Sequence, residues 1–507
     1  MRPPALAVFG LLVLSRGLFA QCPDGTPPPC GRSGARAPAP YSVAVLYFDN
    51  QSRDSNDAYL AAGLTEQILD RLGSVSRLTV KSRNAVRRYR DTDADPQRIG
   101  RELQVSYLAS GSLRRAGDRL RVSVELTRTS SGDRVWGETY DRNASNALAI
   151  EEEVAEAVAT AIVGRLVPGE VRRIAARSAA DPAAHDHVLR GNFFLAQRTA
   201  EATRHAIAEY EAALRIQPSL VPARATLAYA YAIYATWYWP WPGLTRDTLL
   251  ARGLAAANEA VAGPSPPGVA RLALCLTRWA LRPQEVDAAL ACDEQALAAD
   301  PGNAEVLHGL GFARMAAGMD SLAEVTLERA LAVDPARAIT LETIARISYR
   351  TGRLDVARRW LDSAIVVDPG FAQGYTGRAR VRLAQGDTAG AVADATTGAQ
   401  LAPSGSGILF VRVVVLARAG RRDEAEAAMR EASAAGADVL DTPTFGTIYV
   451  AALVALGRRE DALAAVERIQ PRAFELWGQL RAPEFDAIRD DPRFQRVIAE
   501  ARPRVTR

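Results

Sequence analysis

The sequence is poor in the residues that most enzymes use in catalysis. It has four cysteines and four histidines in 507 residues, and Lys81 is its one lysine. It contains no GxSxG, P-loop or HExxH pattern, and no two cysteines have the CxxC spacing of redox and zinc motifs. We therefore expect a protein that is not an enzyme, with no catalytic residue, no cofactor and no metal site.

An excess of charge of one sign is also lacking. The chain has 62 basic and 58 acidic residues, and its formal net charge is +4. Because anions balance the cations along the whole chain, we expect no nucleic-acid partner. We expect no transmembrane span, while peripheral association with a membrane stays open. A composition of 48% hydrophobic and 24% charged residues is typical of globular proteins.

Residues 1–20 predict a signal peptide. Arg2 precedes an apolar stretch over residues 3–15, and the small residue Ala20 stands before Gln21. An apolar stretch of about 7–15 residues is typical of an export signal and too short to span a bilayer. We therefore expect an exported protein, periplasmic or secreted. Gln21, in place of a small residue, argues against a lipid anchor at Cys22.

Residues 21–40 form a linker rich in proline and glycine. Cys22 and Cys30 bracket part of it, and in an oxidising compartment they could close a disulfide loop. An inert pair of thiols in a floppy tail fits equally well. Cys275 and Cys292 lie in a helical stretch, where we expect buried free thiols.

Residues 41–168 predict an α+β domain. Apolar runs and helical spacing indicate a strand at 42–49, a helix at 59–72, a strand at 78–82, a helix at 96–103, strands at 107–114, 120–128 and 134–140, and a helix at 146–166. The links between the last three strands are short and contain glycine, which predicts an antiparallel meander.

Five segments of this domain, in order, are VAVLYFDN, AYLAAGLTEQILDRL, IGRELQV, ASGSLRRAGDRLRVSVEL and GDRVWGETYDR. Together they resemble the TolB amino-terminal-like, or FlgO-like, domain of bacterial envelope and signalling proteins. The resemblance implies a binding or assembly module, carries no active-site residues, and implies that tetratricopeptide (TPR) repeats commonly follow. In many relatives a cytoplasmic signalling domain and a membrane helix come first. Because a signal peptide stands here instead, a fused cyclase, kinase or DNA-binding domain is not expected.

Residues 181–468 carry a 34-residue period, which is typical of TPR repeats. The residues that recur at this spacing are Gly318, Gly352, Gly386 and Gly420, together with Pro301, Pro335, Pro369 and Pro403. In each unit the glycine permits the tight turn between two helices, and the proline ends the second helix. We expect an all-α TPR solenoid of about eight helical hairpins, followed by a carboxy-terminal helical cap at 469–507.

Stacked hairpins enclose a groove that is lined by the first helix of each pair, and such arrays usually bind an extended peptide or a partner helix. The register assigns to this groove His308, Phe312, Glu342, Arg346, Tyr349, Arg350 and Arg380. The arginines would suit an acidic segment or a terminal carboxylate. A solvated charged surface is the alternative interpretation.

An insertion between two paired helices holds Trp237, Trp239 and Trp241 beside two prolines. It is either an aromatic contact patch, exposed for a partner, glycan or membrane, or a plug that folds back over the neighbouring repeats. We slightly favour the plug.

Two functions follow from this organisation. The first is a non-catalytic exported scaffold that binds protein or peptide partners through the TPR groove, with the α+β domain as a second docking module in an envelope assembly. The alternative is a ligand-sensing or substrate-handling protein, hydrolytic if carboxylates do the chemistry, that uses a cleft between the two domains. A deep polar cleft with strongly perturbed carboxylates would favour the alternative.

Overall fold

The computed structural model describes residues 38–502, apart from 55–56, 88, 91–94, 144–145, 176–180, 198, 238, 240, 264–265, 284, 404–405, 436–439, 441–442 and 470–473. The predictions for the signal peptide and for Cys22 and Cys30 lie outside the described residues. Among the described helices, none combines the length and the hydropathy that crossing a bilayer requires.

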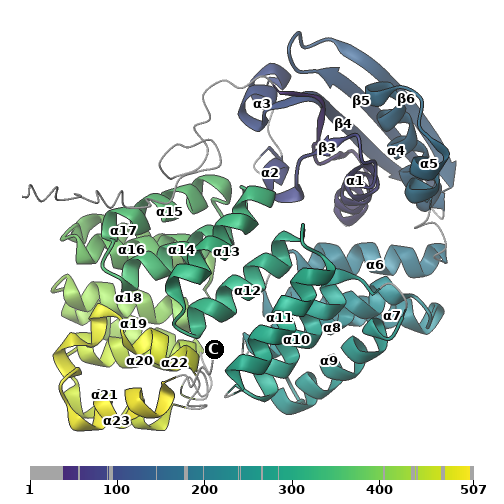
Figure 1. Ribbon diagram of the computed structural model, residues 1–507. Coiled ribbons are helices and arrows are strands. Elements are labelled where there is room, and N and C mark those ends of the chain that lie inside the picture. The colour runs from purple at the N-terminus through teal and green to yellow at the C-terminus, as the bar shows by residue number, and fades with distance from the viewer. Residues whose placement is uncertain are drawn as a thin grey trace, which may run out of the picture.

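The amino-terminal domain is built on a mixed sheet (Figure 1). Its strands are β1 (Ala39–Val45), β2 (Asp49–Asn50), β3 (Thr79–Val80), β4 (Val105–Ala116), β5 (Arg119–Arg128) and β6 (Arg134–Asn143). The spatial order is β3-β1-β4-β5-β6, with β1 parallel to both of its neighbours. Strands β4, β5 and β6 form the antiparallel meander that the glycine-containing links predict. The short β2 extends the sheet by pairing with β4.

Helices cover both faces of this sheet. They are α1 (Ala58–Gly73), α2 (Arg83–Arg87), α3 (Pro96–Leu103), α4 (Ala147–Val163) and α5 (Pro168–Ala175). Successive residues of β1 alternate between the faces, so Val43 and Val45 pack in the cluster of α1 and α4, and Ala44 packs in the cluster of α2 and α3. Helix α3 begins where expected, because the Asp95 side chain accepts hydrogen bonds from two backbone amides of its first turn.

Sixteen helices follow as eight antiparallel pairs in the described part of the chain. They are α6 (Pro182–Leu195), α7 (Ala200–Ile216), α8 (Val221–Thr236), α9 (Arg246–Val261), α10 (Gly268–Leu281), α11 (Val286–Ala299), α12 (Ala304–Ala316), α13 (Asp320–Val333), α14 (Ala338–Arg350), α15 (Leu354–Val367), α16 (Ala372–Ala384), α17 (Thr388–Leu401), α18 (Ser406–Arg418), α19 (Arg422–Ala435), α20 (Pro443–Ala455) and α21 (Arg459–Arg468). The cap adds α22 (Phe474–Leu480), η4 (Pro483–Ile488) and α23 (Pro492–Ala501). The array is a TPR solenoid.

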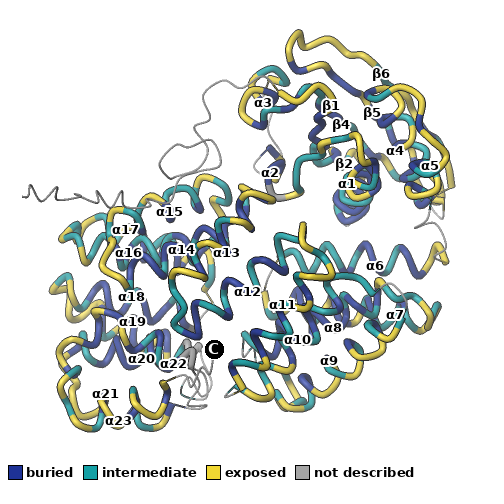
Figure 2. The backbone as a smooth tube through the Cα atoms, viewed as in Figure 1, coloured by how far each residue is buried: buried dark blue, intermediate teal, exposed yellow. Residues whose placement is uncertain are grey.

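The recurring glycines fix the geometry of the pairs. Gly318, Gly352, Gly386 and Gly420 have φ values of 79°, 78°, 84° and 75°, a backbone region that residues with a side chain adopt rarely. Each of these turns reverses the chain within a few residues, so the two helices of a pair pack along their length. Figure 2 shows buried residues along the contacting faces of the helices.

A disulfide joins Cys275 of α10 to Cys292 of α11, with their Cα atoms 5.5 Å apart. The expectation of two free thiols is therefore wrong. The two cysteines lie at equal distances from the link between the helices, so the antiparallel hairpin brings them face to face. Their separation of 17 residues is half of the repeat period, and this spacing is the signal that would have predicted the bond.

The amino-terminal domain contacts the array at two places. At the start of the array, the buried Arg71 of α1 and Glu151 of α4 form an ion pair, and His185 of α6 hydrogen-bonds to the same carboxylate at 2.8 Å. Further along, Arg87 of α2 pairs with Asp368 after α15 at 3.2 Å. The domain therefore lies across the array, as Figure 1 shows.

Candidate binding cavity

One continuous cavity of about 2290 Å³ runs along the inner side of the array. The first helix of every pair, from α6 to α20, contributes residues to its wall. Helices α1 and α2 of the amino-terminal domain border it on one side, and α22 and η4 of the cap border it at the far end. Other parts of the same chain thus contribute to the wall of the groove that the repeat pattern predicts.

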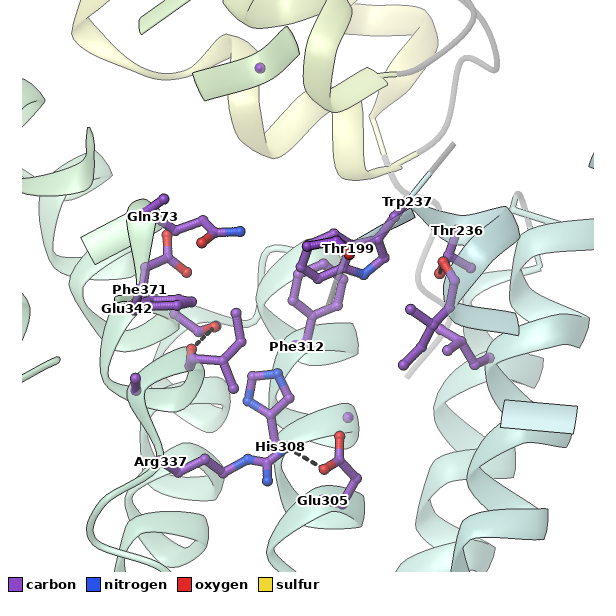
Figure 3. Close-up of a pocket in the computed structure, with 18 of the residues that line it drawn as sticks. Thr199, Thr236, Trp237, Glu305, His308, Phe312, Arg337, Glu342, Phe371 and Gln373 are labelled. Carbon is purple, nitrogen blue, oxygen red and sulfur yellow. Dashed lines mark hydrogen bonds and ion pairs between the residues drawn. The ribbon is translucent and has the colours of Figure 1, made fainter. Parts of the chain in front are cut away.

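All seven residues that the register assigned to the groove border this cavity: His308, Phe312, Glu342, Arg346, Tyr349, Arg350 and Arg380. Figure 3 shows His308 and Phe312 extending from α12 into the space, with Phe371 and Glu342 on the α14–α16 side. The imidazole Nδ1 of His308 lies 3.1 Å from the hydroxyl of Thr340. That these seven residues contact a partner stays a prediction.

The arginines among them already hold carboxylates of this chain. Arg346 pairs with Glu342 on the same helix at 3.5 Å, and its guanidinium lies over the ring of Phe312. Arg350 of α14 pairs with Asp320, and burial lowers its pKa to about 10, with a further contribution from the neighbouring Arg481. Carboxylates of this chain therefore occupy the place at these arginines that an acidic partner segment is expected to take.

The cap supplies the carboxylate for the third arginine. Glu484 of η4 is buried and lies between Arg380, at 2.6 Å, and the hydroxyl of Tyr349, at 3.0 Å. Burial acts to raise the pKa of Glu484, but the Arg380 guanidinium outweighs it and holds the pKa below its ordinary value. The cap therefore contacts the cavity wall through a buried carboxylate.

The tryptophan insertion also borders the cavity. Trp237, Trp239 and Trp241 are half-buried, and the ring of Tyr234 in α8 lies edge-on to two of them, with centroids 5.5 Å and 4.9 Å away. The insertion lies over the neighbouring repeats, which is the arrangement expected of a plug. The three rings border the cavity and give this part of the wall an aromatic surface, and Figure 3 shows Trp237 among them. A contact between these rings and a partner stays a prediction.

Sequence reasoning missed a second group of polar residues in the wall. Glu305 of α12 pairs with Arg337 and accepts a hydrogen bond from the hydroxyl of Tyr229 in α8 at 2.7 Å. Asp293 of α11 is 8% exposed, and burial raises its pKa from 3.8 to about 7, with a further contribution from Glu294. Asp293 was missed because it lies on α11, the second helix of its pair, whereas the register assigns the groove to first helices.

The described residues contain no group of three or more histidine, cysteine, aspartate or glutamate side chains placed to hold a metal ion. The cavity wall is mostly apolar. Several of its charged groups are paired with one another within the chain.

Comparison with known proteins gives one curated relative and several solved repeat structures. No family model matches the sequence. A protein of Rhizobium meliloti (strain 1021) named "Putative adenylate cyclase 3" is 34% identical over 263 residues, which make up 52% of this chain and 43% of that protein. The chain thus spans less than half the length of this relative.

Solved structures to which the chain is similar include TPR proteins. Yeast Tom70 is 13% identical with a TM-score of 0.39, over 70% of this chain and 82% of Tom70. The Cut9-Hcn1 hetero-tetramer of APC/C is 9% identical with a TM-score of 0.46, over 70% of this chain and 63% of the other. YrrB, described as a TPR protein with an unusual peptide-binding site, is 16% identical with a TM-score of 0.28, over 36% of this chain and 93% of YrrB. At these identities the likeness concerns the fold alone.

Proposed function

We propose that this protein is a non-catalytic adaptor that holds a segment of another polypeptide in the cavity of its TPR array. The size of the cavity carries this proposal. Small-molecule pockets usually enclose about 300–1,000 Å³, and this cavity encloses about 2290 Å³. A helix about 10 Å across that rises about 1.5 Å per residue fills such a volume with on the order of 20 residues.

The chemistry of the wall supports a polypeptide occupant. Four of the seven tryptophans of the chain border the cavity, and aromatic side chains give large contact areas at low conformational cost. The contribution of all eight first helices forms one long wall, which suits a chain more than a compact ligand.

The amino-terminal domain is proposed as the second docking module of the adaptor and as a member of the TolB amino-terminal-like class. The order of its segments supports the class. Strand β6 is an edge strand with β5 as its neighbour, and it carries charged side chains that are paired across the strands, Asp141 with Arg119 and Arg121. An edge of this kind is protected against unspecific strand pairing and leaves recognition to side chains.

We also propose that the protein works outside the cytoplasm, in an envelope assembly. The signal-peptide pattern of residues 1–20 supports export. The bond between Cys275 and Cys292 supports it independently, because disulfides persist in oxidising compartments and are rare in the cytosol.

The Rhizobium meliloti relative supplies the second candidate, a ligand-sensing part of a signalling protein. The observation that favours it is that Glu66 and Arg83 of the amino-terminal domain border the same cavity as the array. Binding in the cavity could then act on the rest of such a signalling protein through this domain. Incubation of the purified chain with ATP and Mg²⁺ tests the non-catalytic part of the proposal, because formation of cyclic AMP would refute it.

Tryptophan emission tests the adaptor proposal. The purified full chain is titrated with a library of dodecapeptides whose termini are blocked by acetyl and amide groups. Binding in the cavity is expected to shift the emission to shorter wavelength and to saturate, because four tryptophans lose contact with water. A Trp136→Phe variant, altered on β6 away from the cavity, is the control and keeps the shift. Absence of any saturable shift would remove the proposed function.

A further inference from the structure

The inference concerns the chemistry of the segment that the cavity accepts, and it rests on the proposed function. It begins with the register of the repeats. Asp293 of α11 lies 34 residues before Leu327 of α13 and 68 before Leu361 of α15, so the three side chains share one position of the repeat. The two leucines are 0% and 2% exposed. A carboxylate therefore stands at a core position that leucine fills in the next two pairs.

The space beside this position also differs between the pairs. In the α14–α16 region, a Cβ atom added to Gly377 would lie 2.8 Å from Leu361, because the leucine fills the space beside the glycine. The equivalent of Gly377 beside Asp293 is Gly309 of α12. A Cβ atom added to Gly309 would meet only Leu272, at 3.0 Å, and no other described atom within 4 Å. Space that leucine occupies in the next pairs is thus left open between Asp293 and Gly309.

This space belongs to the cavity, because Asp293, Gly309 and Leu272 all border it. The second residue that the register places beside Asp293 is Thr277 of α10, which is fully buried. Its hydroxyl donates to the backbone carbonyl of Ala273 at 2.7 Å and is not directed at the carboxylate. Neither neighbour supplies a hydrogen bond to Asp293.

The other carboxylates of the cavity wall have partners, although Oε2 of Glu484 is buried without a hydrogen bond. Among the described residues that border the cavity, each carboxylate except Asp293 has an interaction partner: Glu66 has Arg83, Glu305 has Arg337, Glu342 has Arg346, Asp368 has Arg87, Glu484 has Arg380, and Asp70 is engaged as well. A carboxylate that is largely buried and has no partner carries much of the cost of its desolvation, and a cation that enters the cavity would reduce that cost.

We propose that Asp293 binds a lysine or arginine side chain of the polypeptide that occupies the cavity. The basic side chain passes over Gly309, where the wall has no side chain to obstruct it. Its aliphatic part contacts Leu272, and its charged end meets the carboxylate. The segment that the adaptor holds is therefore one that carries a basic residue at a defined position.

The experiment uses the full chain and the blocked dodecapeptide library, so that side chains supply every charge of the peptide. The wild type is expected to enrich peptides with lysine or arginine at one position by about tenfold or more, as expected for a charge-assisted hydrogen bond. The selected peptide is then compared with its norleucine analogue, which keeps the aliphatic chain and lacks the charge.

Three variants make the comparison specific. Asp293→Asn removes the charge at nearly constant volume, and Asp293→Leu restores the residue of the next two pairs. Glu294→Gln is the matched control, because Glu294 is adjacent, pairs with Arg314 and lies outside the cavity wall. The norleucine analogue should bind about tenfold more weakly than the basic peptide to the wild type and to Glu294→Gln, and equally well to both Asp293 variants.

Each other outcome overturns the inference. If peptides bind without enrichment of a basic residue, or if the norleucine analogue loses as much on Asp293→Asn as on the wild type, Asp293 does not hold the basic side chain and the adaptor function stands. If spermidine binds with the same dependence on Asp293 and displaces the peptide, the occupant is a free amine and not a polypeptide. If no peptide binds in the cavity, the inference and the proposed function fail together.

Discussion

The clearest perturbation is the replacement of Asp293 by asparagine, followed by a measurement of stability against pH. The folded protein raises the pKa of this group from 3.8 to about 7, so folding favours the protonated acid. This direction is the reverse of that for a salt-bridged aspartate. Its cost to stability is absent below the ordinary pKa, grows as the pH rises through the interval between the two values, and is constant above the folded pKa.

The magnitude follows from the size of the shift. The difference between 3.8 and about 7 corresponds to about 4 kcal/mol at 1.36 kcal/mol per pKa unit. Asparagine carries no charge in either state, so the variant escapes this cost at neutral and alkaline pH. We expect Asp293→Asn to exceed the wild type by up to about 4 kcal/mol near pH 8 and to match it near pH 4. Asp293→Leu should gain more, because it also fills the space beside Gly309.

Thermal unfolding of both proteins across this pH range is the assay, and amide hydrogen exchange in α10 to α12 locates the effect. Glu294→Gln serves as the control and should follow the wild-type profile apart from a small change, because Glu294 is partly exposed. If Asp293→Asn and the wild type differ by the same amount at both ends of the pH range, Asp293 is not a buried carboxylate of raised pKa and the reasoning fails.

Three further predictions follow from the packing. The Cys292→Ser variant opens the disulfide loop of 17 residues, and its free energy of unfolding in urea should fall by about 3 kcal/mol. Reduced wild type should show an equal loss in the same assay. Glu484→Gln leaves Arg380 without its charged partner and should release the cap, at a cost of about 3–5 kcal/mol, so that limited proteolysis cuts near η4. An unchanged digestion pattern would show that other contacts hold the cap. Leu327→Ala should cost about 2–5 kcal/mol in the same unfolding assay, and a loss below about 1 kcal/mol would contradict its placement in the core.

The array could be predicted because individual residue types mark the ends of its helices. A glycine with positive φ at Gly352 and a proline after the helix end at Pro335 determine where helices turn and stop, whatever lies between them. The same register placed Phe312 and Arg346 on the cavity wall before any coordinates. The antiparallel meander of the amino-terminal domain could be predicted for a similar reason, because short glycine-containing links join neighbouring antiparallel strands.

What could not be predicted depends on parts of the chain that meet only in the folded molecule. Nothing in the pattern around Arg380 indicates that Glu484, 104 residues later, reaches its guanidinium. The helices α2 and α5 were missed because they are too short to display a helical period. Asp293 was missed for a different reason. Its signal is present, because leucine fills the same position in the next two pairs, but this becomes visible only when the second helices of the pairs are aligned.

Photocrosslinking shows where on the protein a bound peptide lies. A photoreactive benzophenone side chain is placed at Phe312 in the cavity wall, at Phe371 on the same wall, and at Val366, which is 63% exposed on the outer helix α15. After irradiation with the selected peptide, the account predicts adducts at Phe312 and Phe371 and none at Val366. Adducts that form at Val366 and are absent from both cavity positions would contradict it.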